Sequence, residues 1–208
     1  MPPYDVNLLY KSLLGAIAAR GTIGQRMHAV IDECERQLPH PDWACLRLVD
    51  FDADLAPLTR WLGAARREGA LHAGHHGLWF GLVNPIREDK GASSDMYVAS
   101  GPSYDGHSLD WPCEIDLRDG VSYLDSSVLD ELYRIAYAAP GGLKNDAEYP
   151  LALAYAAIAA TTALEQWPLP RELASLRGAA AGFDDGDALL LGVFDNLRFC
   201  PQPRRVAS

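Results

Sequence analysis

The longest apolar run in the sequence covers residues 151–164 and is rich in alanine. Residues of one helical face follow each other there at intervals of three or four: Leu151, Tyr155, Ile158 and Thr162. We expect a helix that Asn145 or Asp146 caps, that carries Pro150 in its first turn, and that ends near Gln166. The run is too short to cross a bilayer comfortably.

Four further segments repeat apolar residues with the period of a helix. They are residues 6–17, 23–38, 55–68 and the stretch from Ser126 or Ser127 to Pro140. Thr22 and Gln25 have the spacing of a capping box at the start of the second segment. The sequence therefore predicts about five helices.

Four other segments have the composition and alternation of strands. They are residues 44–51, 77–83, 95–99 and 189–194. The Gly- and Asp-rich stretch 182–187 predicts a tight turn, and the stretch 101–121 predicts a long irregular connection. We expect an α+β fold, with one domain over residues 1–200, an antiparallel sheet packed with about five helices, and a loose tail at 201–208.

The charge of the chain limits its partners. The formal net charge is −10. Proteins bind nucleic acids and anionic membrane surfaces mainly through Lys and Arg, so neither is expected as a partner of this chain. A protein partner is therefore expected to be basic. No phosphate-binding loop and no nucleophile elbow occurs in the sequence, so we expect no cofactor and no catalytic residues.

The four cysteines are far apart and include no Cys-x-x-Cys pair, which is typical of free thiols. The chain starts without a basic segment ahead of an apolar one, as a secretory leader would have. These two features predict a cytoplasmic protein.

A histidine cluster is the alternative site that the sequence offers. His72, His75 and His76 are imidazole donors, as zinc and similar ions require. Their spacing differs from His-Glu-x-x-His, and no glutamate lies among them. We expect no metal, and keep a metal-dependent hydrolase as the second hypothesis.

Two groups of aspartates have simpler interpretations than cation binding. Asp50, Asp52 and Asp54 alternate, but the chain has neither the Gly nor the Glu that a calcium loop would need. Asp54 instead suits the N-cap of the following helix. The acids of 182–187 are residues that a tight turn favours.

Negative charge and aromatic residues gather in one part of the chain. Between Tyr104 and Glu148 there are ten acidic and three basic residues, and seven of the nine tyrosines lie between Tyr97 and Tyr155. Acidic groups steer basic partners, and Tyr and Trp anchor interfaces. The residues expected to bind a partner are Tyr104, Asp105, Asp110, Trp111, Glu114 and Asp116. The alternative is a solvated acidic loop over an aromatic core.

Three runs add a family resemblance. They are Gly77-Leu-Trp-Phe-Gly-Leu-Val-Asn-Pro85, Gly142-Leu-Lys-Asn-Asp-Ala-Glu-Tyr-Pro150 and Gly182-Phe-Asp-Asp-Gly-Asp-Ala-Leu-Leu-Leu-Gly192. They resemble bacterial proteins found beside polymorphic toxins, and the third is similar to the Gly/Asp turn and closing strand of SUKH-type immunity proteins. The resemblance implies a non-enzymatic immunity or antitoxin protein that blocks a basic toxin, such as a nuclease.

Overall fold

The computed structural model describes residues 4–83, 86–87, 91–92, 94–138, 140–184 and 186–202. Within this part of the chain there are six α-helices and three short 3₁₀ helices. The α-helices are α1 (Val6–Ala18), α2 (Ile23–Gln37), α3 (Asp42–Leu46), α4 (Leu55–Arg67), α5 (Ser127–Ala136) and α6 (Asn145–Gln166). The 3₁₀ helices are η1 (Trp111–Glu114), η2 (Leu117–Asp119) and η3 (Arg171–Leu173). The predicted α+β class is confirmed.

The described strands form one large sheet and one small hairpin. They are β1 (Gly77–Val83), β2 (Ile86–Arg87), β3 (Gly91–Ala92), β4 (Asp95–Gly101), β5 (Ser122–Leu124), β6 (Gly178–Phe183), β7 (Ala188–Asp195) and β8 (Arg198–Pro201). The large sheet has the order β5-β4-β1-β6-β7-β8, and β2 pairs with β3.

The large sheet is mixed, so the expectation of a purely antiparallel sheet is wrong. Its central strands, β1 and β6, are parallel, while the other neighbouring pairs are antiparallel. The chain between β1 and β6 includes both α5 and α6. A crossover through helices returns the chain in its original direction, which a hairpin does not do.

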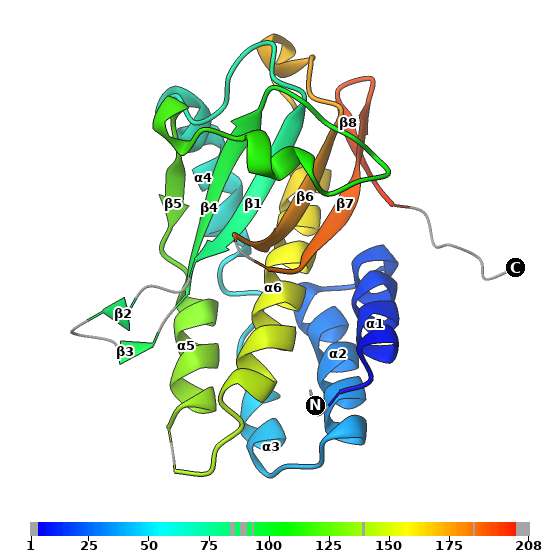
Figure 1. Cartoon of the computed structure of the whole chain (residues 1–208), viewed down its shortest axis with the longest axis vertical. Coiled ribbons are helices and arrows are strands. Elements are labelled where there is room, and N and C mark those ends of the chain that lie inside the picture. Colours follow the sequence, from blue (N-terminus) through cyan, green and yellow to red (C-terminus); the bar gives the residue numbers. More distant parts are fainter. Residues whose placement is uncertain are drawn as a thin grey trace, which may run out of the picture.

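In Figure 1, α4 and the upper part of α6 lie behind the sheet and the segment between β4 and β5 lies in front of it, while α1, α2, α3 and α5 lie below the sheet, beside the lower part of α6. We call the helix side the inner face and the other side the outer face. Helix α6 packs against β1, β6, β7 and β8, and is surrounded by α1, α2, α4 and α5. The segment 102–121, drawn in green, crosses in front of the sheet in this view. The sheet is therefore the middle layer of three.

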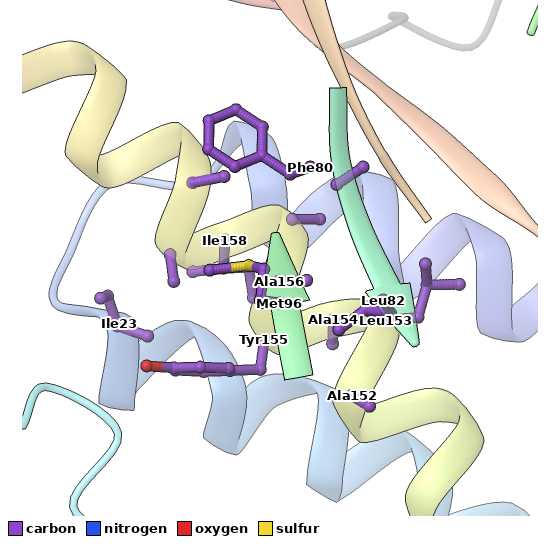
Figure 2. Packing of buried hydrophobic residues seen from close by; sticks show 14 of the residues in the cluster. Ile23, Phe80, Leu82, Met96, Ala152, Leu153, Ala154, Tyr155, Ala156 and Ile158 are labelled. Carbon is purple, nitrogen blue, oxygen red and sulfur yellow. The ribbon is translucent and has the colours of Figure 1, made fainter. Parts of the chain in front are cut away.

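The inner core is built around α6. Sixteen of its 22 residues are buried, which is typical of a helix surrounded by protein on all sides. Figure 2 shows its alanines and Tyr155 packed with Phe80 and Leu82 of β1 and with Met96 of β4. Small side chains allow neighbouring elements to approach this helix closely. No helix in the described residues is long and apolar enough to cross a membrane.

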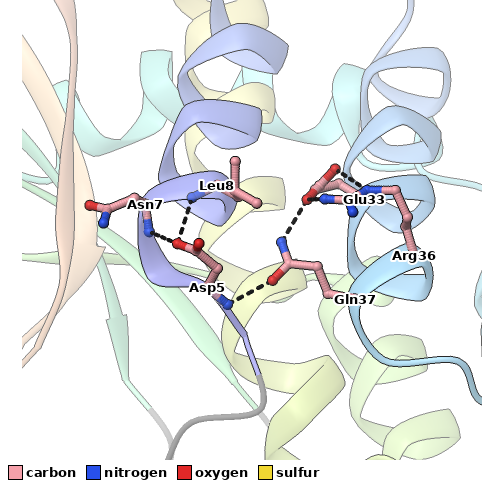
Figure 3. Close-up of polar contacts among 6 residues, drawn as sticks. All are labelled: Asp5, Asn7, Leu8, Glu33, Arg36 and Gln37. Atoms are coloured by element: carbon pink, nitrogen blue, oxygen red, sulfur yellow. Dashed lines mark hydrogen bonds and ion pairs between the residues drawn. The ribbon is translucent and has the colours of Figure 1, made fainter.

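Polar contacts fix the first two helices, and the sequence predicts one of them, the capping box. The capping box of Thr22 and Gln25 is present at the start of α2. Asp5 caps α1, and its backbone N–H donates to Oε1 of Gln37, 2.7 Å away, at the end of α2 (Figure 3). Gln37 in turn donates to Glu33 at 2.6 Å. These bonds hold α1 and α2 together at one end.

Two local predictions are wrong. The segment 44–51 is not a strand: α3 occupies Asp42–Leu46 and turns follow it, with Trp43 and Leu46 buried. The start of α6 is preceded by Lys144, which has a φ of 47° and makes no side-chain cap, so neither Asn145 nor Asp146 caps the helix. Pro150 is accordingly the sixth residue of α6 and lies beyond the first turn.

Candidate functional site: an aromatic cleft on the outer face

Glycines remove side chains from the outer face of the two central strands. Gly77 pairs with Gly178, and Gly81 pairs with Gly182. Because residues two apart point to the same side of a strand, all four lie on the outer face with Trp79. The inner-facing residues between them are large on β1 and small on β6. Two rungs of the sheet are thus free for side chains from elsewhere.

Aromatic rings occupy the space above three of these glycines, Gly77, Gly81 and Gly178. A methyl group at Gly77 would lie 2.3 Å from the ring of Trp111, and one at Gly178 would lie 2.2 Å from the ring of Tyr104. A methyl group at Gly81 would lie 2.2 Å from the ring of Tyr97. Distances this short exclude any side chain, so the glycines are required for this packing.

The outer face has its own small hydrophobic core. Its buried members are Trp79, Tyr97, Ala99, Trp111 and Ala180, and half-buried residues of the segment 102–121 cover them. Trp111 is only 3% exposed, so its expected place on a partner-binding surface is wrong. The ring of Tyr104 lies 5.5 Å from that of Trp111 and is half-buried. Both aromatics of the predicted site hold the segment on the sheet.

A hydrogen-bonded chain leads from this core to a carboxylate. Trp79 Nε1 donates to the hydroxyl of Tyr97 at 3.0 Å, and that hydroxyl donates to Oδ1 of Asp184 at 2.5 Å. Indole N–H is a donor only, so the one proton of the Tyr97 hydroxyl is directed to Asp184. Burial, together with the bond to Asp184, raises the pKa of Tyr97, which keeps this proton in place. Asp184 is exposed and is positioned by buried groups.

An open cleft of about 270 Å³ lies between the segment 102–121 and the turn that joins β6 to β7. We call it the outer-face cleft. Its lining combines aromatic, aliphatic and acidic side chains: Trp79, Tyr97, Leu109, Pro112, Cys113, Ile115, Leu117, Phe183, Asp184, Gly186 and Ala188. Asp184 is the charged residue of this lining among the described residues. The cleft is thus a recess of mixed polar and apolar surface with one carboxylate.

The predicted acidic residues lie on the segment that covers the sheet. Asp105, Asp110 and Glu114 are exposed, and their hydrogen-bond partners belong to the same segment. Asp105 accepts from the backbone of His107, Asp110 accepts from Ser108, and Glu114 accepts from Ser103. None of these three pairs with a cation in the described structure, so their charge faces solvent.

Asp116 differs from these three acids. It accepts hydrogen bonds from the backbone and the guanidinium of Arg118, the closest at 2.6 Å. Those bonds lower the pKa of Asp116 to about 2. The cation offsets its charge, so Asp116 contributes less to the negative surface than the other three acids.

The histidines do not form a metal centre. The rings of His72 and His75 are 4.9 Å apart, while Nδ1 of His75 lies 2.9 Å from the carbonyl of Ser100. Nδ1 of His76 is 2.8 Å from the carbonyl of Pro102. Among the residues that the structure describes, no three His, Cys, Asp or Glu side chains converge to hold a metal ion. The hydrolase hypothesis therefore has no ligand set here.

The alternating aspartates are used inside the fold. Asp52 accepts from the backbone N–H of Ile23 and Gly24 at the start of α2. Asp54 accepts from Ser126, Ser127, Tyr155 and the N–H of Val128 at the start of α5. Asp54 is the N-cap residue of α4, as the sequence predicts, but its side chain makes no capping hydrogen bond there. These carboxylates bind helix N-termini, where the helix dipole favours an anion.

The acidic turn faces both sides of the sheet. Asp184 binds Tyr97 on the outer face, whereas Asp187 accepts from Tyr149 of α6 on the inner side. The ring of Tyr149 stacks on Phe183 at 5.9 Å. Asp185 lies outside the described residues. The predicted turn is confirmed, and its two described aspartates hold it in place by contacts with different layers.

Sequence reasoning missed Trp79, Tyr97 and Asp184 as a group. One signal was available, because β1 and β6 each have glycines four residues apart. Such spacing leaves one strand face bare, which indicates a close covering layer. Comparisons with known proteins returned no match among family models, curated proteins or solved structures.

Proposed function

We propose that this chain is a non-enzymatic immunity or antitoxin protein that binds and blocks a basic bacterial toxin in the cytoplasm. The observation that carries the proposal is the placement of Asp105, Asp110 and Glu114. All three are exposed on one segment that is anchored to the sheet. An acidic surface on a fixed support attracts a basic partner and presents it with a defined geometry.

The segment is anchored to the sheet, which favours a binding role over the alternative of a solvated loop with no binding role. Trp111 and Tyr104 fix the segment against Gly77 and Gly178. A surface that is ordered before binding loses less entropy when a partner docks. The basic cleft of a nuclease is one surface that such an acidic segment would complement.

The decisive experiment is a protection assay with the partner in hand. Proteins that bind the tagged chain in its native host are identified, and each basic candidate is expressed alone to test for toxicity. Co-expression of this chain should restore growth. The variant Asp105→Asn/Asp110→Asn/Glu114→Gln should lose protection, and association should slow and depend less on salt, because these charges steer the encounter.

A matched variant controls for net charge. Asp32→Asn/Glu35→Gln/Asp50→Asn removes the same three charges from the helix side, where Asp32 and Glu35 pair with Arg47. It should protect as well as the unaltered chain. Equal protection by both variants would exclude the acidic segment as the interface. A chain that neutralises no toxic partner would contradict the proposal itself.

A further inference from the structure

We propose that the outer-face cleft is a receptor for one arginine side chain of the basic partner. This inference deepens the proposed function and rests on it for the identity of the partner. The juxtaposition that carries it is a carboxylate at the mouth of an aromatic recess: Asp184 beside Trp79 and Tyr97. The cleft is distinct from the exposed acids of the segment, none of which lines it.

One oxygen of the Asp184 carboxylate can accept a hydrogen bond from a ligand. Tyr97 donates to Oδ1 of Asp184, and no described residue donates a hydrogen bond to Oδ2. Tyr97 uses one of the four lone-pair sites of this carboxylate, so each oxygen keeps at least one site for a guanidinium that approaches from the cleft. Because Tyr97 is itself held by Trp79, Asp184 is oriented before a ligand arrives. An oriented acceptor favours a planar bidentate donor.

The walls of the cleft suit the rest of an arginine. Leu109, Ile115 and Leu117 present aliphatic surface, and the half-buried ring of Phe183 presents aromatic surface, while Trp79 and Tyr97 are almost fully buried. A guanidinium stacks on aromatic faces and is more weakly hydrated than an ammonium, so it loses less on entering a recess that is partly apolar. The three methylenes of arginine can lie along the aliphatic wall while the head reaches Asp184.

The volume of the cleft favours a single side chain over a cofactor as its occupant. Pockets for small molecules usually have volumes of about 300–1,000 Å³. The outer-face cleft, at about 270 Å³, is at the small end of that range and is open to solvent. A single protruding side chain fits this space, and its backbone would remain outside, beside the acidic segment. The cleft and the segment would then act on the same partner.

The test uses N-acetyl-arginine amide as the probe and the indole N–H of Trp79 as the reporter. The full chain is labelled with ¹⁵N and titrated with the probe, and the shift of this signal is followed. N-acetyl-citrulline amide is the matched ligand, because citrulline keeps the shape of arginine without its charge. N-acetyl-lysine amide supplies the charge without the planar group. We expect a saturable shift with arginine, a weaker response with lysine and none with citrulline.

Two variants of one turn localise the effect. Asp184→Asn removes the charge and retains an oxygen that accepts from Tyr97, so it should weaken arginine binding by about tenfold. Asp187→Asn is the matched control, since Asp187 faces Tyr149 on the other side of the sheet. It should leave arginine binding unchanged.

Each other result overturns the assignment. Equal binding of citrulline would show an uncharged site, and equal binding of lysine would show no preference for a guanidinium. An unresponsive Trp79 signal, or equal loss in both variants, would remove the cleft as the binding site. These outcomes leave the protection assay untouched. If arginine binds as expected and no toxin is neutralised, the cleft stands and the proposed function fails.

Discussion

The two faces of the large sheet are covered in opposite ways. On the inner face, whole helices pack together, and α6 contributes buried residues on every side. On the outer face, one segment with two short 3₁₀ helices covers a core of five buried residues. The packing of the inner layer is the result of many contacts between helices and strands. The outer layer depends on a few aromatic rings, each fitted to a glycine.

The carboxylates of the two layers also differ in what they contact. On the helix side, Asp52 and Asp54 are bonded to helix N-termini. On the outer side, Asp105, Asp110 and Glu114 stay exposed. A carboxylate that is bonded inside the fold stabilises it and is not available to a partner, whereas an exposed one adds little stability and acts at long range. The bonded acids of the inner layer thus support the fold, and the exposed acids of the outer layer are the ones that the proposed function uses.

The sharpest way to break this comparison is to remove the buried acid of the helix side. Asp54→Ala takes the acceptor from Ser126, Ser127, Tyr155 and the N–H of Val128. A buried donor without a partner costs about 1–3 kcal/mol, and serine hydroxyls can rotate to other acceptors. We expect the free energy of unfolding, measured with urea, to fall by about 3–4 kcal/mol.

The matched control is Asp50→Ala, four residues earlier. Asp50 is exposed, and among the described residues its side chain accepts one local bond, from the N–H of Asp52 at 3.2 Å. Its loss should change stability by less than about 1 kcal/mol. If both substitutions destabilise equally, the network around Asp54 is not what holds α4, α5 and α6 together.

The second prediction concerns the aromatic layer. Gly81→Ala places a methyl group within the ring of Tyr97, so that ring must move and its bond to Asp184 must lengthen or break. Overpacking of this kind costs about 1–3 kcal/mol. In urea unfolding, the variant should be less stable than the unaltered chain, and the indole signal of Trp79 should shift.

Gly15→Ala is the control, because nothing lies within 4 Å of a methyl group at this helical position. Alanine in the interior of a helix is better than glycine by roughly 0.5–1 kcal/mol, so this variant should be more stable. Opposite signs for the two substitutions would sharpen the distinction between a glycine required by packing and one that is not. If Gly81→Ala leaves stability unchanged, the ring of Tyr97 does not pack against Gly81 of β1.

Much of the helical layer could be predicted from the sequence, because its signals are local. The capping box at Thr22, the cap at Ser126 and the apolar spacing of five helices each depend on neighbours in the chain. The strand predicted at 44–51 failed because five residues are too few for periodicity to identify a helix. There, burial of Trp43 and Leu46 decides the structure.

The candidate site was predicted only in part, because its geometry is non-local. Asp105, Asp110 and Glu114 were identified from charge, and they are exposed. Trp111 was placed on the surface because nothing within 101–121 signals that Gly77 and Gly101 lie beneath it. The bond between Tyr97 and Asp184 joins residues 87 positions apart. Such pairs follow from the register of β1 with β4 and β6, which periodicity does not provide.

A smaller effect is expected when the outer acids are neutralised. Asp105→Asn/Asp110→Asn/Glu114→Gln removes exposed charges whose bonds are local, and the amides can still accept those bonds. Stability in urea should therefore change by less than about 0.5 kcal/mol per site. A large loss of stability would show that these acids support the fold and would weaken their assignment to recognition.

The smallest effect concerns Asp116, the predicted acid that has a cation beside it. Its folded-state pKa is about 2, against an ordinary value of 3.8, because Arg118 donates to the carboxylate. A depressed pKa stabilises the folded state above the unfolded pKa, and this contribution is lost as pH falls from about 4 to about 2.

NMR titration of the Asp116 carboxyl should give a midpoint near 2. In Arg118→Ala the midpoint should rise toward 3.8 but not reach it, because the backbone N–H of residue 118 still donates. A midpoint of 3.8 in the unaltered chain would mean that the ion pair does not form in solution. Asp116 would then belong with the three unpaired acids that steer a basic partner.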